Sequence, residues 1–279
     1  MLAVVALLAT SCLLLEPTDP GPLRFRDEIF SDVTRTNGIV YGQNTSQTGA
    51  TVTLALDFYE PAGDTAQLRP LIIWVHGGSF SAGNRASPEL VDQATVFGRK
   101  GYTSASISYR LSAQGCTVVN AGCIESIVDA TEDAQAAVRF FRANADTYRI
   151  DPDRIAIAGS SAGGITAMNV GFGAEVPGNS GNPGHPSDVE AAVSLSGARL
   201  LGTCDEDAAP AMLFHNEVDP LVPYDWAANT KSCADDGGTW ARVRTFPGTG
   251  HVPYVAHRTE IIDVTTTFLF NALEVRELL

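Results

Sequence analysis

The order of apolar and polar residues predicts an alternation of strands and helices along most of the chain. Residues Thr51 to Tyr59 alternate polar and apolar side chains, as a strand with one solvated face does, and the turn Pro61-Ala62-Gly63-Asp64 follows. We therefore expect this strand near an edge of the sheet. Leu71 to Val75 is a continuous apolar run, and Thr103 to Tyr109 and Arg154 to Ala158 are rich in β-branched or small residues. Such runs are typical of interior strands in a parallel sheet.

A helix is predicted between the last two of these strands. Apolar residues recur near the helical period over Ser126 to Ala145, which indicates a crossover helix. Its expected core face consists of Ile127, Ala130, Ala134, Ala137, Val138 and Phe141. Three further strands are predicted, separated by segments compatible with helices: Val189 to Leu195, Ala211 to His215 and Arg242 to Phe246. This alternation predicts an α/β fold with a mostly parallel, doubly wound sheet, whose binding groups lie at the carboxyl ends of the strands.

Length and charge restrict the class of protein. The 279 residues contain no internal repeat and no linker-like change of composition, so we expect a single domain. The chain has 32 acidic and 18 basic side chains, and the acidic excess is spread along the sequence. This charge would repel a phosphate backbone, so nucleic acid is excluded as a partner.

The first 20 residues have the composition of a targeting segment. Leu2 to Leu15 is almost wholly apolar but shorter than the roughly 20 residues that a membrane-spanning helix needs. We therefore expect residues 1–20 to be an export signal or a lipoprotein leader. The second reading depends on Ala9-Thr10-Ser11-Cys12, which loosely resembles a lipobox with Cys12 as the lipidated residue.

Four cysteines beyond Cys12 agree with export to an oxidising compartment. They allow three pairings, and proximity along the chain favours Cys116 with Cys123 and Cys204 with Cys233. The alternative is four free thiols. None of the cysteines has the spacing of a zinc site.

The most informative motif is Gly159-Ser160-Ser161-Ala162-Gly163, because it directly follows the predicted strand Arg154 to Ala158 and precedes a helix-forming segment. G-x-S-x-G between a strand and a helix is typical of a nucleophile elbow, whose tight turn needs residues without side chains at its two ends. Ser161 is therefore the candidate nucleophile. The alternative is an ordinary turn with a capping serine.

Two other strand ends supply the groups that activate a serine. The strand Ala211 to His215 is followed by Asp219, and the strand Arg242 to Phe246 is followed by His251. An imidazole can accept the serine proton and later donate it to a leaving alcohol, and a buried carboxylate can orient that imidazole. We predict His251 as the base and Asp219 as the acid, with Glu217 and Asp225 as rivals for the acid.

A glycine-containing turn, His76-Gly77-Gly78-Ser79-Phe80, directly follows the strand Leu71 to Val75. Backbone N–H groups near glycines are accessible and can stabilise the negative oxygen of a tetrahedral intermediate. We expect the oxyanion donors to be the amides of Gly78, Ser79 and Ala162. A plain glycine turn is the alternative.

Taken together, these motifs resemble the α/β-hydrolase superfamily, in the carboxylesterase and lipase group with an HGGG-like oxyanion motif, to which feruloyl and acetyl esterases belong. The resemblance covers roughly residues 50–275. It depends on His76 to Phe80, Ser108-Tyr109-Arg110, Asp151 to Arg154, Gly159 to Gly164, Asp219 to Pro223 and Gly250-His251. Ser79 replaces the third glycine of the commonest motif. The resemblance implies that residues 21–279 form an α/β-hydrolase catalytic domain.

The resemblance implies a serine carboxylesterase that cleaves short acyl or aryl esters through an acyl-enzyme, without a metal or an organic cofactor. The expected partner is a small-molecule or polymer-linked ester, such as those on plant polysaccharide or polyester. Phe80 and Tyr254 are candidates for the substrate pocket, and Val176 to Ser187 is either a rim of the site or a solvated connection.

Two other functions remain open at this point. A peptidase of the prolyl oligopeptidase type has the same order of motifs, although residues 1–50 are too few for its gating domain. A non-catalytic binding protein on a hydrolase scaffold is the other alternative, although such proteins lose members of the triad.

Overall fold

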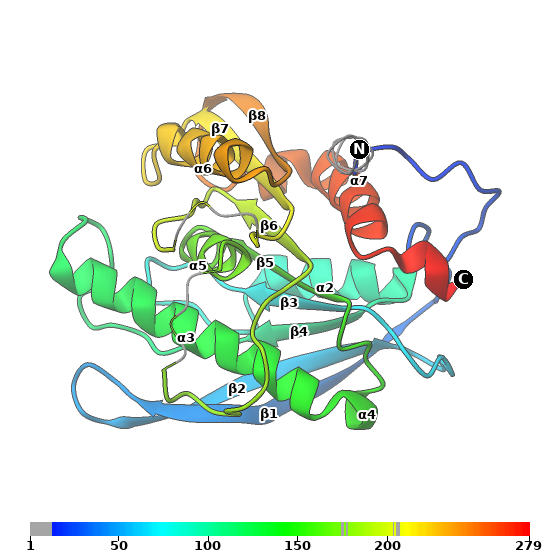
Figure 1. The fold of residues 1–279 in the computed structure, drawn as a ribbon, viewed down its shortest axis with the longest axis horizontal. Coiled ribbons are helices and arrows are strands. Elements are labelled where there is room, and N and C mark those ends of the chain that lie inside the picture. Colours follow the sequence, from blue (N-terminus) through cyan, green and yellow to red (C-terminus); the bar gives the residue numbers. More distant parts are fainter. Residues whose placement is uncertain (1–12, 174–175, 177, 203, 205–206) are drawn as a thin grey trace, which may run out of the picture.

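The protein is described by a computed structural model covering residues 13–173, 176, 178–202, 204 and 207–279. Eight strands form one sheet in the order β1-β2-β4-β3-β5-β6-β7-β8 (Figure 1). Pairing is antiparallel for β1 with β2 and for β2 with β4, and parallel for all other neighbours. The strands are β1 (Val33–Thr45), β2 (Thr51–Pro61), β3 (Leu71–Val75), β4 (Thr103–Ile107), β5 (Ile155–Ser160), β6 (Ala191–Leu195), β7 (Ala211–Val218) and β8 (Ala241–Thr249).

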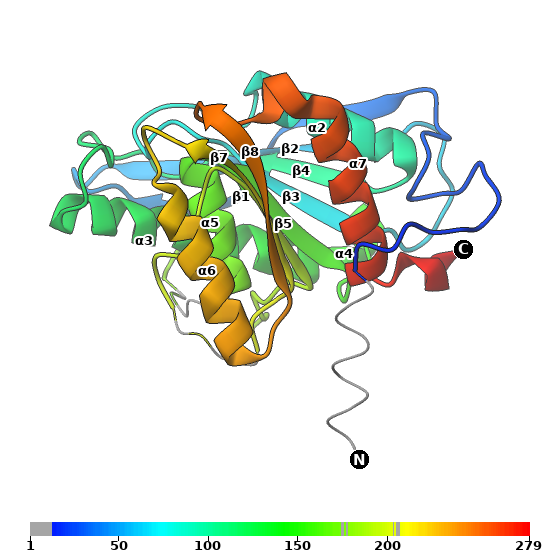
Figure 2. The ribbon, with the colours of Figure 1, turned by 90° about the horizontal axis from the view of Figure 1, so that it is seen from above.

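Helices cover both faces of the sheet. Figure 2 shows α2 and α7 on one side and α3, α5 and α6 on the other. The helices are α2 (Pro88–Lys100), α3 (Ala121–Ala143), α4 (Ala145–Tyr148), α5 (Ala162–Gly171), α6 (Tyr224–Gly237) and α7 (Tyr254–Ala272), and a 3₁₀ turn η1 (Val275–Leu278) follows. The predicted mostly parallel, doubly wound α/β fold in a single domain is confirmed.

Strand β3 shows why a strand in the centre of the sheet consists of apolar residues only. Leu71, Ile73 and Val75 point into the core layer under α3, α5 and α6, whereas Ile72 and Trp74 point into the layer under α2 and α7. All five residues are buried, because successive side chains of a strand alternate between its faces. Both faces of the central strands therefore have to be apolar.

The sheet has an edge strand that was not predicted, next to the strand that was predicted to lie near an edge. The alternating segment Thr51 to Tyr59 does form a strand, but β1 lies outside it and is the actual edge. β1 is mostly exposed and carries polar residues and two glycines, so its sequence has neither an apolar run nor a clear alternation. Its pairing with β2 shifts register twice, between Thr36 and Ile39 and between Val40 and Gly42.

The long helix α3 begins earlier than its apolar periodicity indicates. The side-chain Oδ1 of Asn120 accepts a hydrogen bond from the amide of Cys123 at 2.9 Å, which caps the helix at Asn120 and starts it at Ala121 rather than Ser126. Its first residues face solvent more than the rest, so the apolar repeat becomes visible only one turn later.

Both predicted disulfides are present. Cys116 and Cys123 join the loop after β4 to the first turn of α3, with Cα atoms 4.4 Å apart. Cys204 and Cys233 join the segment after β6 to α6, with Cα atoms 5.1 Å apart. The alternative of four free thiols is therefore wrong.

The predicted targeting segment overlaps residues that contact the folded domain. Leu13 and Leu14 pack at the border of the core layer under α7, and Nδ2 of Asn271 donates to the carbonyl of Leu15 at 3.0 Å. Residues 1–12, including Cys12 and most of the expected leader, lie outside the described residues. Among the residues that are described, no helix is both long and apolar enough to cross a membrane.

Candidate active site

The turn that follows β5 places Ser161 in a strained conformation at the carboxyl edge of the sheet. Ser161 has φ 52° and ψ −119°, a region that residues with side chains rarely adopt. A Cβ atom on Gly159 would collide with the carbonyl of Gly163, and one on Gly163 would collide with the carbonyl of Val75. The two glycines are thus required by the close approach of β5, α5 and β3, as the motif predicts.

The structure brings the three predicted catalytic side chains together. Nε2 of His251 lies 2.7 Å from Oγ of Ser161, and Nδ1 of His251 lies 2.8 and 2.9 Å from the two carboxylate oxygens of Asp219. The three residues are 32 to 90 positions apart in the chain. They come together because they follow β5, β7 and β8, which are parallel strands that end at the same edge of the sheet. The contacts form one continuous hydrogen-bonded chain.

Asp219 is held as a carboxylate. Burial alone would raise the pKa of this carboxyl, but hydrogen bonds from His251 and from the amides of Val222 and Leu221 lower the pKa to about 2. A charged Asp219 can only accept at Nδ1 of His251, so this nitrogen carries the proton and Nε2 is free to accept from Ser161. The rivals Glu217 and Asp225 are both exposed, so the structure favours Asp219.

Hydrogen bonds within the loop after β3 fix the orientation of its peptide groups. The carbonyl of Gly78 accepts hydrogen bonds from the amides of Ser81 and Ala82, both at 3.0 Å. Because C=O and N–H of a trans peptide point in opposite directions, these bonds fix the direction of the Ser79 N–H. Ser79 and Phe80 both have positive φ, 51° and 61°. We refer to residues 77–82 as the oxyanion loop.

His76 fixes the preceding peptide of this loop, between Gly77 and Gly78. Its Nδ1 lies 2.7 Å from the carbonyl of Gly77, which belongs to the peptide whose N–H is that of Gly78. Burial lowers the pKa of His76 to about 4, so the ring is neutral and Nδ1 is the donor. The ring stacks on Tyr109 at 4.2 Å between centroids, and its Nε2 is buried without a hydrogen-bond partner among the described residues.

Ala162 is the first residue of α5, directly after Ser161. The first amides of a helix have no partner within the helix, and the helix dipole makes this end favourable for negative charge. The amides of Gly78 and Ser79 belong to the oxyanion loop, and that of Ala162 belongs to the first turn of α5.

A cavity of about 130 Å³ opens beside Ser161. Its wall has polar and apolar surface in similar amounts and is formed by the oxyanion loop, the start of α5, the turn after Asp219, α6 and the loop before α3. The lining residues are Ser79, Phe80, Cys116, Thr117, Val119, Ser161, Ala162, Ile165, Pro220, Leu221, Val222 and Trp226. The predicted pocket residue Phe80 is among them.

No group of three or more His, Cys, Asp or Glu side chains within the described residues is arranged to hold a metal ion.

Tyr254, the other predicted pocket residue, lies elsewhere. It is buried in the core layer under α2 and α7, and its hydroxyl donates to Asp92 of α2 at 2.6 Å. It does not line the cavity, because its ring packs into that core layer. This correction removes Tyr254 from the candidate substrate pocket.

The segment from residue 178 to residue 187 is also not a rim of this site. It lies over α3 and β1: Ser180 donates to Asp133 of α3 at 2.5 Å, its carbonyl accepts from Gln43 of β1 at 3.1 Å, and Asn182 donates to the carbonyl of Tyr41 at 2.8 Å. None of its described residues lines the cavity beside Ser161. The segment is a connection that fastens β1 to α3.

Sequence reasoning missed much of the cavity wall. Thr117 and Val119 belong to a loop without periodicity or motif, and nothing in the sequence indicates that it reaches the nucleophile. The predicted disulfide at Cys116 was the available signal, since it ties this loop to α3. Leu221 and Val222 follow Asp219 in a turn that the sequence did single out.

Solved esterase structures share the fold of the whole domain. Thermogutta terrifontis esterase 2, in a structure phosphorylated by paraoxon, superposes with a TM-score of 0.69 at 22% identity, covering 89% of this chain and 96% of that one. A truncated carbohydrate esterase from gut microbiota superposes with a TM-score of 0.65 at 21% identity, covering 89% and 98%. These likenesses show the α/β-hydrolase fold.

Curated relatives match a shorter segment. Secreted lipase 5 of Gibberella zeae is 32% identical over 104 residues, which is 37% of this chain and 19% of that protein. Carboxylesterase NlhH of Mycobacterium tuberculosis is 31% identical over 110 residues, which is 39% of this chain and 31% of that protein. The matched segment thus spans between about a fifth and a third of these relatives' length.

The BD-FAE family model matches residues 56–199, just over half of the 279 residues, and this match includes β3 with the oxyanion loop and β5 with Ser161. With the architecture and the site described above, it shows that the chain belongs to the BD-FAE family of α/β-hydrolases.

Proposed function

We propose that this protein is a serine carboxylesterase, with Ser161 as nucleophile, His251 as general base and acid, and Asp219 as the group that orients His251. The observation that carries the proposal is the continuous hydrogen-bonded chain from Asp219 through His251 to Oγ of Ser161. A serine hydroxyl is a weak nucleophile on its own, and a neutral imidazole at 2.7 Å can take its proton during attack.

The first half of the reaction forms an acyl-enzyme. Oγ of Ser161 attacks the ester carbonyl while its proton passes to Nε2 of His251, and the carbonyl π electrons move to the oxygen. The amides of Gly78, Ser79 and Ala162 donate to this oxyanion, and each such donor commonly contributes about 3 kcal/mol. The tetrahedral intermediate then expels the alcohol, which takes the proton from His251. The Asp219 carboxylate stabilises the transient imidazolium.

The second half regenerates the enzyme by the same steps with water. His251 takes a proton from water as the water oxygen attacks the acyl carbon, and the resulting tetrahedral intermediate expels Oγ of Ser161. His251 returns the proton to Oγ, and the carboxylic acid leaves.

The size of the cavity supports short acyl or aryl esters as substrates. The cavity of about 130 Å³ next to Ser161 is small for a ligand pocket, and the rings of Phe80 and Trp226 in its wall suit an acyl or aryl group. One structural neighbour is named a carbohydrate esterase. We extend this to our protein as the proposal that its natural substrates include short esters on plant polysaccharide, with a soluble polyester as an alternative polymer.

Export supplies the setting for this activity. The two disulfides are typical of oxidising compartments, and one relative is named a secreted lipase. We propose that residues 1–20 contain the signal for export. This signal is either a cleaved signal peptide or a lipoprotein leader in which Cys12 is lipidated.

Steady-state kinetics of Ser161→Ala tests the proposed function. On p-nitrophenyl acetate, kcat should fall by at least about 10³-fold, because nucleophile, base and acid act as a unit. Ser160→Ala is the matched control, since this neighbouring hydroxyl contacts Glu89 rather than His251, and it should stay within about tenfold of the wild type. Activity of Ser161→Ala above about a tenth of wild type would overturn the assignment, and cleavage of a prolyl p-nitroanilide without ester cleavage would favour the peptidase.

A further inference from the structure

The loop of residues 111–120, between β4 and α3, forms one wall of the cavity beside Ser161. Cys116, Thr117 and Val119 line the cavity from this loop, together with residues of α5 and α6. Thr117, Val118 and Val119 are exposed, so this part of the loop is not held by burial in the core. We refer to residues 111–120 as the wall loop.

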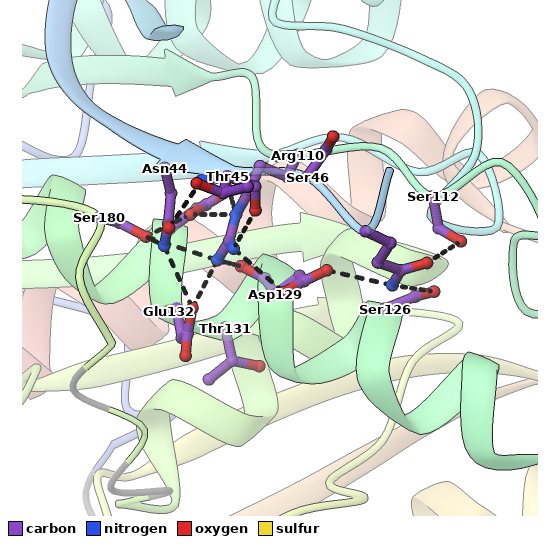
Figure 3. Close-up of polar contacts among 12 residues, drawn as sticks. Asn44, Thr45, Ser46, Arg110, Ser112, Ser126, Asp129, Thr131, Glu132 and Ser180 are labelled. Carbon is purple, nitrogen blue, oxygen red and sulfur yellow. Dashed lines mark hydrogen bonds and ion pairs between the residues drawn. The ribbon is translucent and has the colours of Figure 1, made fainter. Parts of the chain in front are cut away.

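The wall loop is attached to α3 directly before its start and again at its middle. Arg110, directly before the loop, forms ion pairs with Asp129 at 3.1 Å, with Glu132 at 2.5 Å and with Asp133 at 3.0 Å. Figure 3 shows this guanidinium among the polar side chains of α3, with Ser112 at the start of the loop. In the middle of the loop, the disulfide joins Cys116 to Cys123, which is buried in the first turn of α3.

The wall loop holds the oxyanion loop through backbone hydrogen bonds. The amide of Cys116 donates to the carbonyl of Ser79 at 2.9 Å, and the amide of Ser112 donates to the carbonyl of Phe80 at 2.8 Å. Ser79 is one of the proposed oxyanion donors, and both it and Phe80 have positive φ. A strained conformation of this kind persists only where surrounding contacts determine it.

The wall loop and the oxyanion loop are in such close contact at Gly115 that a side chain has no space there. Gly115 has φ 64°, and a Cβ atom on it would lie 2.8 Å from Oγ of Ser81 and 2.9 Å from the carbonyl oxygen of Ser79. The disulfide therefore restrains a segment that is in direct van der Waals contact with the oxyanion loop.

We propose that the Cys116–Cys123 disulfide is a positioning element of the active site: it holds the Cys116 amide on the Ser79 carbonyl and keeps the wall loop closed against the acyl cavity. The disulfide thereby supports the oxyanion donors and limits the length of the acyl group. This inference rests on the proposed function and adds a determinant of acyl specificity to it.

The test compares two double variants. Cys116→Ser with Cys123→Ser removes the positioning disulfide, and Cys204→Ser with Cys233→Ser is the control that removes the other one. For the first variant we expect kcat on p-nitrophenyl acetate to fall about tenfold, and the ratio of kcat/KM for the octanoate over the acetate to rise at least about fivefold. For the control we expect both quantities within about twofold of wild type. A merely stabilising disulfide would change the unfolding temperature but not the chain-length ratio.

Hydrogen exchange supplies a readout that does not depend on turnover. In the Cys116→Ser, Cys123→Ser variant, amides of residues 78–82 should exchange at least about tenfold faster than in wild type, whereas the control variant should leave them unchanged. If the wild type cleaves no ester, the proposed function fails, and exchange alone then decides whether the disulfide positions the loop. Unchanged exchange and an unchanged chain-length ratio, or equal changes in both double variants, would overturn the inference.

Gly115→Ala tests the same contact with both disulfides intact. Its Cβ would push the wall loop away from Ser79 and Ser81, so we expect the same direction of change in kcat and in the chain-length ratio. Gly63→Ala is the control, since Gly63 also has positive φ, 77°, but no atom within 4 Å of the added Cβ. A wild-type ratio for Gly115→Ala, or an equal change for Gly63→Ala, would contradict the proposed contact.

Discussion

Nδ1 of His251 lies 2.8 Å from the nearer carboxylate oxygen of Asp219, and the Asp219 side chain is fully buried. The amides of Leu221 and Val222 bind the same carboxylate, so it cannot rotate away from the imidazole. This contact determines which nitrogen of His251 carries the proton, and therefore whether the ring can accept from Ser161.

Replacing the acid tests this relationship. In Asp219→Asn the side-chain amide can donate to Nδ1 of His251, which favours the tautomer with the proton on Nε2, where it cannot accept from Ser161. We expect kcat on p-nitrophenyl acetate to fall by about 10³ to 10⁴-fold with little change in KM. The exposed rivals provide the controls: Glu217→Gln and Asp225→Asn should retain activity within about twofold. A loss in either control comparable to that of Asp219→Asn would assign the acid elsewhere.

His76 predicts a pH dependence of stability. Its pKa is about 4 in the folded protein, below the ordinary value of 6.5, because burial disfavours the charged ring. The unfolded chain therefore binds a proton at higher pH than the folded chain, so this contribution is fully present above about pH 6.5 and is lost as the pH falls toward 4. The loss amounts to about 3 kcal/mol at most.

Urea unfolding between pH 7.5 and pH 4.5 measures this effect. His76→Asn keeps a donor near the Gly77 carbonyl but has no titrating group, so its free energy of unfolding should decline less steeply with acid than that of wild type. The quantity to compare is the slope of the free energy of unfolding against pH, because losing the stacking on Tyr109 lowers the stability of the variant at every pH. Equal slopes would show that His76 is not kept neutral by burial.

Arg110 predicts a large effect on stability. Its nearly buried guanidinium compensates Asp133, whose side chain is fully buried and whose pKa is raised by burial. Arg110→Met leaves this carboxyl without its counter-charge, and we expect a loss of about 3 to 5 kcal/mol in the free energy of unfolding. In the control Arg258→Met the ion pair with Asp92 is exposed, and the loss should stay below about 1 kcal/mol. Similar losses in both variants would contradict the importance of burial.

The sequence predicted the centre of the fold more fully than its edges. β3 and β5 are apolar on both faces, and the glycines at positions 159 and 163 are required by contacts that a Cβ would make impossible, so both features are visible in the residues themselves. β1 was not predicted because it is exposed and held to β2 mainly by backbone pairing, which does not depend on an apolar pattern.

In the candidate site, too, some features could be predicted from the sequence and others could not. Ser161, Asp219 and His251 follow recognisable strands, so the topology of a parallel sheet was sufficient to bring them to one edge. The cavity wall depends on how loops fold over that edge, and neither Thr117 nor Val119 carries a local signal for this. Tyr254 was a candidate for the pocket as an aromatic residue, but its ring is buried in the core layer under α2 and α7.

Covalent labelling tests the central claim most directly. The wild-type protein would be treated with a fluorophosphonate, digested, and mapped by mass spectrometry across the peptide that contains Ser160 and Ser161. We predict one adduct per chain, on Ser161, that is absent from Ser161→Ala and is formed at least about 100-fold more slowly by His251→Ala. An adduct on Ser160 or at another site, or labelling of Ser161 that does not depend on His251, would contradict the proposed catalytic assembly.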